Sequence, residues 1–306
     1  MEQKKQTIKP ELKYICDDIT GECIILAPHR HKRPEGLKKK IHDPFAPKNL
    51  QRENILAQFG QGKDRVWVVE NGFPVFPASG EFSGYQDIFV EGESCQPFHS
   101  CGIGMLETMF EAYASRALEM RKRKGVKYIL IFKNDGLDAG ASLPHPHSQI
   151  FALNFIPSRV KQIIRKRKAL VKQTGRNMIE SALREAAPRL KVYSDRYVVA
   201  YADPASRFAY GVRIILKRQI DNITEATSAE RKALASAIHA LLPLMKDLDC
   251  AFNIFFHDVV GEKDELFEIN FVPRVNRWGG FELDGGIVVN PVAAETAAEE
   301  YRRAKR

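Results

Sequence analysis

The order of expected structural elements repeats once along this 306-residue chain. Each half contains a strand, an amphipathic helix, a second strand, a loop and a third strand. In chain order, these elements are residues 86–90, 106–120, 127–132 and 148–153, and then 208–216, 227–248, 251–256 and 266–272. Residues 129–134 and 252–257 also resemble each other in sequence. The repeat predicts an internal duplication in an α+β fold, with helices packed on mixed, largely antiparallel sheets.

The join between the two halves is predicted near residue 175, which gives domains of 1–175 and 176–306. In the second half, Thr227 and Glu230 fit a helix-starting capping box, and Pro243 is expected to kink that helix near its end. The joining segment, residues 159–190, is expected to be helical. It carries a run of basic side chains, which we interpret as a solvated helix face. They are Lys161, Arg165, Lys166, Arg167, Lys168 and Lys172.

Composition and charge exclude several classes of protein. The net charge of +9 favours anionic ligands, but the basic run has neither the interleaved aromatics nor the reading helix of a nucleic-acid site. No run of about 18 apolar residues exists, so no membrane span is expected. The five cysteines are few, scattered and odd in number. They do not predict a disulfide framework, and a reducing cytoplasm is the expected location.

One short segment combines residue types that perform phosphoryl chemistry. His145, His147 and Gln149 alternate, so a strand would place all three on one face. The preceding loop, residues 134–142, is rich in small residues that let backbone amides approach a phosphate. A neutral imidazole is a good nucleophile towards phosphorus. A bare His-x-His pair, however, is equally typical of half a metal site or of a structural pair.

The block His145-Pro146-His147-Ser148-Gln149, with Asn134, Gly140 and Ser142 before it, resembles the active-site segment of the galactose-1-phosphate uridylyltransferases. Their motif reads His-Pro-His-Gly-Gln. That family belongs to the histidine-triad superfamily and is a tandem duplication of its fold. The resemblance implies that His147 is the nucleophile that accepts the nucleotide, next to His145. It also implies that Gln149, Ser142 and Asn134 surround the phosphates, with Gly140 in the same loop.

Two further segments carry the resemblance towards the N-terminus. Residues 19–34 are similar to a family segment whose two arginines lie near the nucleotide phosphates, which implies that role for Arg30 and Arg33. Asn71, Phe73 and Pro74 lie in a stretch that resembles the family's nucleoside-binding turn. Near the other end, residues 279–283 and 290–292 look like plant-type relatives that work as ADP-glucose phosphorylases.

The chain departs from the family at the positions of its metal ligands. Many members hold a structural zinc with a Cys-x-x-Cys pair, a later His and the first His of the motif. Here the pair reads Asp43-Pro44-Phe45-Ala46 and the later His falls at Cys95, so only His145 remains and no zinc is expected. Some members hold a second metal in the C-terminal half. There Glu268 and Asn270 replace histidines although His257 remains, so we expect that half to be non-catalytic.

Three functions follow from these observations. The resemblance implies a nucleotidyltransferase that moves a nucleoside monophosphate from a nucleoside diphosphate sugar to a sugar 1-phosphate or phosphate through His147, working as a homodimer. A phosphorylase or hydrolase is the first alternative, but single-domain triad hydrolases usually carry a third histidine where this chain has Gln149. The second alternative is a nucleotide-binding pseudoenzyme, for which the lost metal ligands argue.

Overall fold

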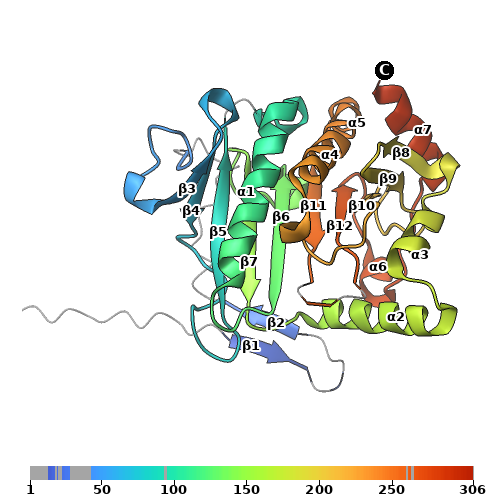
Figure 1. Ribbon diagram of the computed structural model, residues 1–306, viewed down its shortest axis with the longest axis horizontal. Helices are drawn as coiled ribbons and strands as arrows, with labels where there is room; N and C mark the ends of the chain where they lie inside the picture. The colour runs from blue at the N-terminus through green and yellow to red at the C-terminus, as the bar shows by residue number, and fades with distance from the viewer. Residues whose placement is uncertain are drawn as a thin grey trace, which may run out of the picture.

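The computed structural model describes residues 13–17, 19, 23–27, 43–92, 95–259, 261–262 and 265–305. Its centre is a ten-stranded sheet with the strand order β3-β4-β5-β7-β6-β11-β12-β10-β9-β8 (Figure 1). The strands are β3 (Ile55–Phe59), β4 (Val66–Glu70), β5 (Gly84–Glu91), β6 (Tyr128–Asp135), β7 (His147–Leu153), β8 (Lys191–Ser194), β9 (Val198–Ala202), β10 (Val212–Leu216), β11 (Phe252–His257) and β12 (Glu268–Pro273). A separate hairpin pairs β1 (Lys13–Cys16) with β2 (Cys23–Leu26).

The strand order confirms the expected duplication and fold class. From each edge to the centre, the two halves follow the same path: β3, β4, β5, β7 and β6 in one, and β8, β9, β10, β12 and β11 in the other. All neighbouring strands of the sheet pair antiparallel. Because β6 pairs with β11, the two halves share one continuous sheet.

Helices lie on both faces of this sheet. They are α1 (Ile103–Arg121), α2 (Ser158–Thr174), α3 (Met178–Glu185), α4 (Ser228–His239), α5 (Leu242–Leu248), α6 (Gly280–Gly285) and α7 (Ala294–Ala304). Figure 1 shows α1 and α4 running along one face, each over its own half of the sheet. They pack against each other across the join between the halves. None of the helices in the described residues is long and apolar enough to cross a membrane.

Strand alternation assigns each side chain to one face of the sheet. On β6, Ile129 and Ile131 join the large core under α1 and α4, whereas Tyr128 packs with Ile164 of α2 on the opposite face. On β7, Ile150 belongs to the α1 face and Phe151 to the α2 face. We call these the α1 face and the α2 face below.

The second-half helix begins as the sequence predicts and ends differently. Thr227 accepts a hydrogen bond from the Glu230 amide, and the Glu230 carboxylate accepts one from the Thr227 amide, so the capping box is confirmed. Pro243 does not kink a single helix. The chain breaks after α4, and Pro243 lies in the first turn of α5, where its missing N–H costs nothing.

Two other expectations need correction. The strand expected over 208–216 begins only at Val212, because the preceding residues form a turn in which Tyr210 has a φ of 61°. Cysteine pairing was not expected, yet the structure has disulfides Cys16–Cys23 and Cys95–Cys101. Count and spacing failed as guides, because the β1–β2 register places Cys16 opposite Cys23. Cys250 is a free thiol.

Candidate active site

Strand β7 begins at His147, and alternation places His147 and Gln149 on the α2 face. The His147 Nδ1–H donates to the backbone carbonyl of His145 over 2.8 Å. This hydrogen bond assigns the proton to Nδ1 and leaves the lone pair on Nε2. Among the described residues, Nε2 has no hydrogen-bond partner. His147 therefore has the tautomer and the free nitrogen that a nucleophile requires.

Burial sets the protonation state of this imidazole. His147 is only 5% exposed. Burial lowers its pKa to about 4, although its hydrogen bond to the His145 backbone opposes the shift. The nearby Lys133 ammonium acts in the same direction as burial. His147 is therefore neutral near pH 7, and its lone pair is available without loss of a proton.

The first histidine of the motif has a different environment. The His145 ring is buried, with Nδ1 2.8 Å from the Asp43 carboxylate and Nε2 2.8 Å from the Glu91 backbone carbonyl. Both partners are acceptors, so each ring nitrogen of His145 faces a hydrogen-bond acceptor. The ring of Phe45 lies 6.1 Å from the His145 ring and 5.3 Å from the His147 ring, between centroids. Segment 43–46 therefore buttresses the two histidines.

These contacts do not fit a zinc ion at the family's structural site. Both nitrogens of His145 are engaged, Cys95 is bonded to Cys101, and Ala46 offers no ligand. No cluster of three or more potential metal ligands occurs in the described ranges. Segment 43–46 is connected to β7 by the Asp43–His145 pair and by the packing of Phe45. In relatives, a metal is expected to make this connection.

A buried polar network supports β7 from the α1 face. Glu91 is fully buried, and its carboxylate accepts from the Lys133 ammonium at 2.6 Å and from the Ser148 hydroxyl. Ser148 also shares a hydrogen bond of 2.7 Å with the Tyr113 hydroxyl. The Lys133 ammonium lies 3.3 Å from the His147 carbonyl oxygen and 4.1 Å from the centre of the Phe98 ring. These further polar contacts offset the desolvation cost of burying the Lys133–Glu91 ion pair.

Glu91 touches most of the motif. Its carboxylate binds Ser148, its backbone carbonyl accepts from His145, and its amide donates to the Pro146 carbonyl at 3.1 Å. The sequence interpretation missed Glu91, Lys133 and Tyr113 as supporting residues. The available signal was Lys133 itself, a charge directly after the apolar run of β6, at a position that strand alternation places on the same face as Ile129 and Ile131.

The loop before the motif lies beside His147 on the sheet. Asn134 is near the end of β6, and its side-chain oxygen Oδ1 accepts from the side-chain amide of Asn253 at 2.9 Å. After it, the 3₁₀ helix η6 (Leu137–Ala139) ends at Gly140, whose φ of 83° is a conformation that favours glycine. Ser142 is half-buried between this glycine and His145. The predicted phosphate residues are therefore close to His147 along the chain and on adjacent strands.

The predicted nucleoside turn lies further along the same part of the sheet. Asn71 caps its own turn by accepting from the Phe73 amide at 2.9 Å, and the Phe73 ring is 56% exposed. Pro74 is also exposed. Gln86 of β5 anchors the next residues by accepting from the Val75 amide at 2.6 Å. In the β5–β7 register, Gln86 lies opposite Phe151, four residues from His147, or about 13 Å along the strand.

Arg30 and Arg33 lie outside the described residues, so their predicted contact with the phosphates stays a prediction.

The duplication identifies the C-terminal counterparts of these residues. In the first hairpin, Asn134 follows Lys133, the partner of Ser148, and therefore lies opposite His147. In the second hairpin, His257 of β11 pairs with Glu268 of β12. Superposing the two hairpins therefore places Glu268 at the position of His147, Asn270 at that of Gln149 and His257 at that of Asn134. The second half has no histidine at the nucleophile position.

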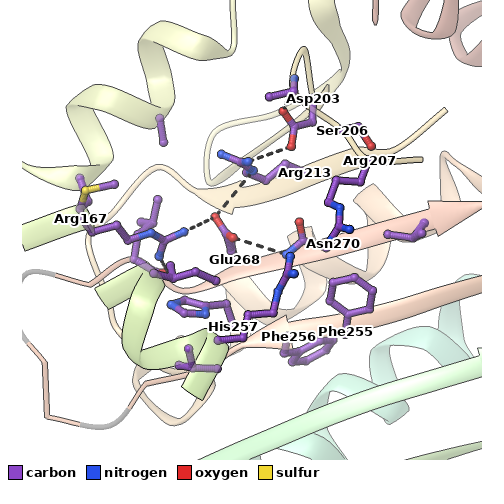
Figure 2. Close-up of a pocket in the computed structure, with 18 of the residues that line it drawn as sticks. Arg167, Asp203, Ser206, Arg207, Arg213, Phe255, Phe256, His257, Glu268 and Asn270 are labelled. Atoms are coloured by element: carbon purple, nitrogen blue, oxygen red, sulfur yellow. Dashed lines mark hydrogen bonds and ion pairs between the residues drawn. The ribbon is translucent and has the colours of Figure 1, made fainter. Parts of the chain in front are cut away.

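Ion pairs occupy the region where the sequence predicted lost metal ligands (Figure 2). Arg167 of α2 lies 2.9 Å from both the Glu265 and Glu268 carboxylates, and His257 lies 2.8 Å from Glu265. Arg213 lies on the other side of Glu268, at 3.8 Å. The interpretation of the basic run as wholly solvated is thus wrong for Arg167, because its position on α2 faces two buried carboxylates.

Comparison with known proteins adds independent observations. Residues 104–157 match the family model described as galactose-1-phosphate uridyl transferase, N-terminal domain. The galactose-1-phosphate uridylyltransferase of Thermotoga maritima is 29% identical over 64% of this chain and 66% of its own length, just under two thirds. The ADP-glucose phosphorylase of Arabidopsis thaliana is 25% identical over 96% of this chain and 92% of its own length.

Solved structures agree at the level of the fold. A uridylyltransferase structure matches 95% of this chain and 98% of its own chain, with a TM-score of 0.81 at 23% identity. The Arabidopsis thaliana ADP-glucose phosphorylase with bound ADP-glucose matches 95% and 99%, with a TM-score of 0.75 at 23% identity. With the fold duplicated and the motif on β7, the chain is similar to galactose-1-phosphate uridylyltransferases and to an ADP-glucose phosphorylase in sequence, and it shares their fold.

Proposed function

We propose that the chain transfers a nucleoside monophosphate from a nucleoside diphosphate sugar to a sugar 1-phosphate or to phosphate, with His147 as the covalent carrier. The observation that carries this proposal is the hydrogen bond from His147 Nδ1 to the His145 carbonyl. It orients a neutral imidazole with Nε2 free on the face that also carries Gln149 and Asn134.

In the first step, His147 Nε2 attacks the α-phosphorus of the nucleoside diphosphate sugar. A P–N bond forms and the bond from the α-phosphorus to the bridging oxygen breaks, so the sugar 1-phosphate leaves with that oxygen and its electron pair. The Nδ1–H bond to the His145 carbonyl stabilises the positive charge that develops on the ring. Gln149, Ser142 and the backbone around Gly140 are proposed to donate to the phosphate oxygens.

In the second step, a phosphate oxygen of the acceptor attacks the same phosphorus and the P–N bond breaks. His147 regains its lone pair, and the nucleotide leaves joined to the acceptor. Such a double displacement predicts ping-pong kinetics. Because burial lowers the pKa of His147 to about 4, the free enzyme needs no general base before the first attack.

The proposal is tested by intact-mass measurement after separate incubation with UDP-glucose, UDP-galactose and ADP-glucose. We expect the mass of one UMP or AMP to be added at neutral or alkaline pH, where a phosphoramidate persists. His147→Asn should show no adduct. His239→Asn is the matched control, since it removes an exposed histidine on α4 and should leave the adduct intact. Labelling that survives in His147→Asn would contradict the proposal.

A phosphorylase is the second candidate, because an ADP-glucose phosphorylase is among the relatives that match nearly the whole chain. The Arabidopsis thaliana ADP-glucose phosphorylase aligns over 96% of this chain and 92% of its own length. Both activities share the first step and differ in the acceptor. Adding inorganic phosphate or glucose 1-phosphate to the nucleotidylated protein distinguishes them, because only the true acceptor should remove the adduct rapidly.

We further propose that the enzyme is a homodimer in the cytoplasm. The dimer is supported by resemblance, and light scattering would measure it directly. The cytoplasmic location is supported only by the charged sugar phosphates proposed as substrates. The cysteine argument no longer supports it, because four of the five cysteines form disulfides.

A further inference from the structure

We propose that the C-terminal half holds a second, non-catalytic nucleotide site in a cavity over β11 and β12. The cavity has a volume of about 750 Å³ and is lined by the α2 face of the sheet, α2, α3 and residues 203–208. Its lining includes Glu268, Asn270 and His257 but neither His147 nor Gln149. The cavity is therefore next to the candidate active site and separate from its nucleophile.

The duplication explains why a ligand site would exist here. Glu268, Asn270 and His257 are the counterparts of His147, Gln149 and Asn134, as the strand registers show. The cavity thus covers in one half the positions that the proposed active site covers in the other. Asn134 lines the near end of the cavity, so the two regions are neighbours on one sheet face.

The charges of the lining favour an anion. Each acidic residue of the lining pairs with an arginine: Glu268 pairs with Arg167 at 2.9 Å. Asp203 and Glu185 share Arg213, at 2.8 and 3.0 Å. Arg207 is different. Within the described part of the chain it makes no hydrogen bond or ion pair, and its buried Nε has no partner. An uncompensated guanidinium in a largely apolar cavity recognises a planar or tetrahedral oxyanion well.

Figure 2 shows Arg207 and Asn270 on one side of the cavity, close to Phe255. Arg207 is supported from behind by Trp278, whose ring centre lies 4.6 Å from the guanidinium carbon. Apolar side chains form much of the cavity wall. They include Leu130, Phe132, Phe255, Val160 and Ile163. A nucleotide fits this arrangement, because its flat base would lie against the apolar wall and one phosphate would bind Arg207. Asn270 supplies an amide that can pair with a base or ribose.

The site would bind without reacting. The side chain at the nucleophile position is the Glu268 carboxylate, which lies between Arg167 and Arg213. A carboxylate paired with two guanidinium groups is a poor nucleophile. We therefore assign the cavity to binding, with a substrate or product nucleotide as a regulatory ligand. The choice of a nucleotide rests on the proposed function, whereas the existence of an anion site rests on Arg207 and the cavity.

Calorimetric titration of the full chain in the His147→Asn background, with UMP, AMP and UDP-glucose as probes, tests the proposal. We expect two bound nucleotides per chain for at least one probe. Arg207→Gln should weaken the second site about ten- to a hundredfold, as loss of a charge-assisted contact does. Ala205→Trp, at an exposed position on the cavity wall, should block that site by bulk. Arg196→Gln is the matched control, because it is an exposed arginine over Tyr197 and outside the cavity lining.

The outcomes separate this inference from the proposed transfer reaction. The inference is supported if Arg207→Gln and Ala205→Trp each reduce two bound nucleotides to one. Covalent labelling of His147 should be unchanged when the same substitutions are made in the native chain. One nucleotide per chain for every probe would overturn it, as would two sites that neither variant alters. If His147 is never labelled but the second binding event still depends on Arg207, the transfer reaction fails and the second site stands.

Discussion

At the scale of single residues, the site depends on which protons are held in place. His147 is neutral because it is buried, and its free nitrogen follows from one backbone hydrogen bond. The sequence could predict that His147 and Gln149 share one face of a strand, because their alternation is local. The sequence could not predict that Glu91 and Asp43 contact His145, because they lie 54 and 102 positions before it in the chain.

The depressed pKa of His147 has a consequence for stability. Its folded value is about 4 and its unfolded value about 6.5. Between these pH values the unfolded chain binds more protons than the folded chain. The contribution of His147 to the free energy of unfolding is therefore complete above pH 6.5 and is lost as pH falls through 4. The loss reaches about 3 kcal/mol. Urea unfolding should show that the free energy of unfolding falls between about pH 7.5 and about pH 4. This fall should be smaller by about that amount in His147→Asn. An equal drop in both proteins would contradict it.

At the scale of elements, α2 depends on an arginine, Arg167, whose side chain is only 12% exposed. Through Arg167, this highly charged helix forms ion pairs with Glu268 of β12 and with the neighbouring Glu265. A helical pattern was visible in the sequence, but its basic residues gave no sign that one of them was buried. The carboxylates that select Arg167 lie about a hundred residues away, so only the tertiary fold distinguishes Arg167 from Lys166.

We therefore predict that Arg167→Met lowers the free energy of unfolding by about 3 kcal/mol, because it leaves two buried carboxylates without their main cation. Lys166→Met is the matched control on the exposed side of the same helix, with an expected change within about 0.5 kcal/mol. Urea denaturation measures both. Adding Glu268→Gln to Arg167→Met should recover part of the loss, and equal effects of the two single variants would refute the prediction.

At the scale of the whole molecule, the two halves are joined more closely than their sequence boundary implies. The predicted division near residue 175 falls just after α2, whose last turn ends at Gly175. However, β6 pairs with β11, and Arg231 of α4 binds Glu111 of α1 at 2.7 Å. A periodic sequence predicts that a unit is repeated, but it carries no information on which edges of the two copies meet.

Because the sheet is continuous, we predict that neither half folds independently. A fragment of residues 176–306 would expose the β11 edge and the apolar surface that α4 buries against α1. Circular dichroism should show little cooperative unfolding for this fragment, whereas the full chain should unfold in one transition. A fragment with a sharp transition of its own would show instead that the join is a contact between autonomous domains.

Strand β7 serves two purposes with alternate side chains, and this separates the phenotypes that substitutions there will produce. His147 and Gln149 point to one side, where reacting molecules are proposed to bind, whereas Ser148 and Ile150 point to the other, into the buried network and the core. A mutational scan of residues 147–150 should thus divide by the parity of the residue number. Positions 147 and 149 should report turnover in a folded protein, and positions 148 and 150 should report cellular abundance.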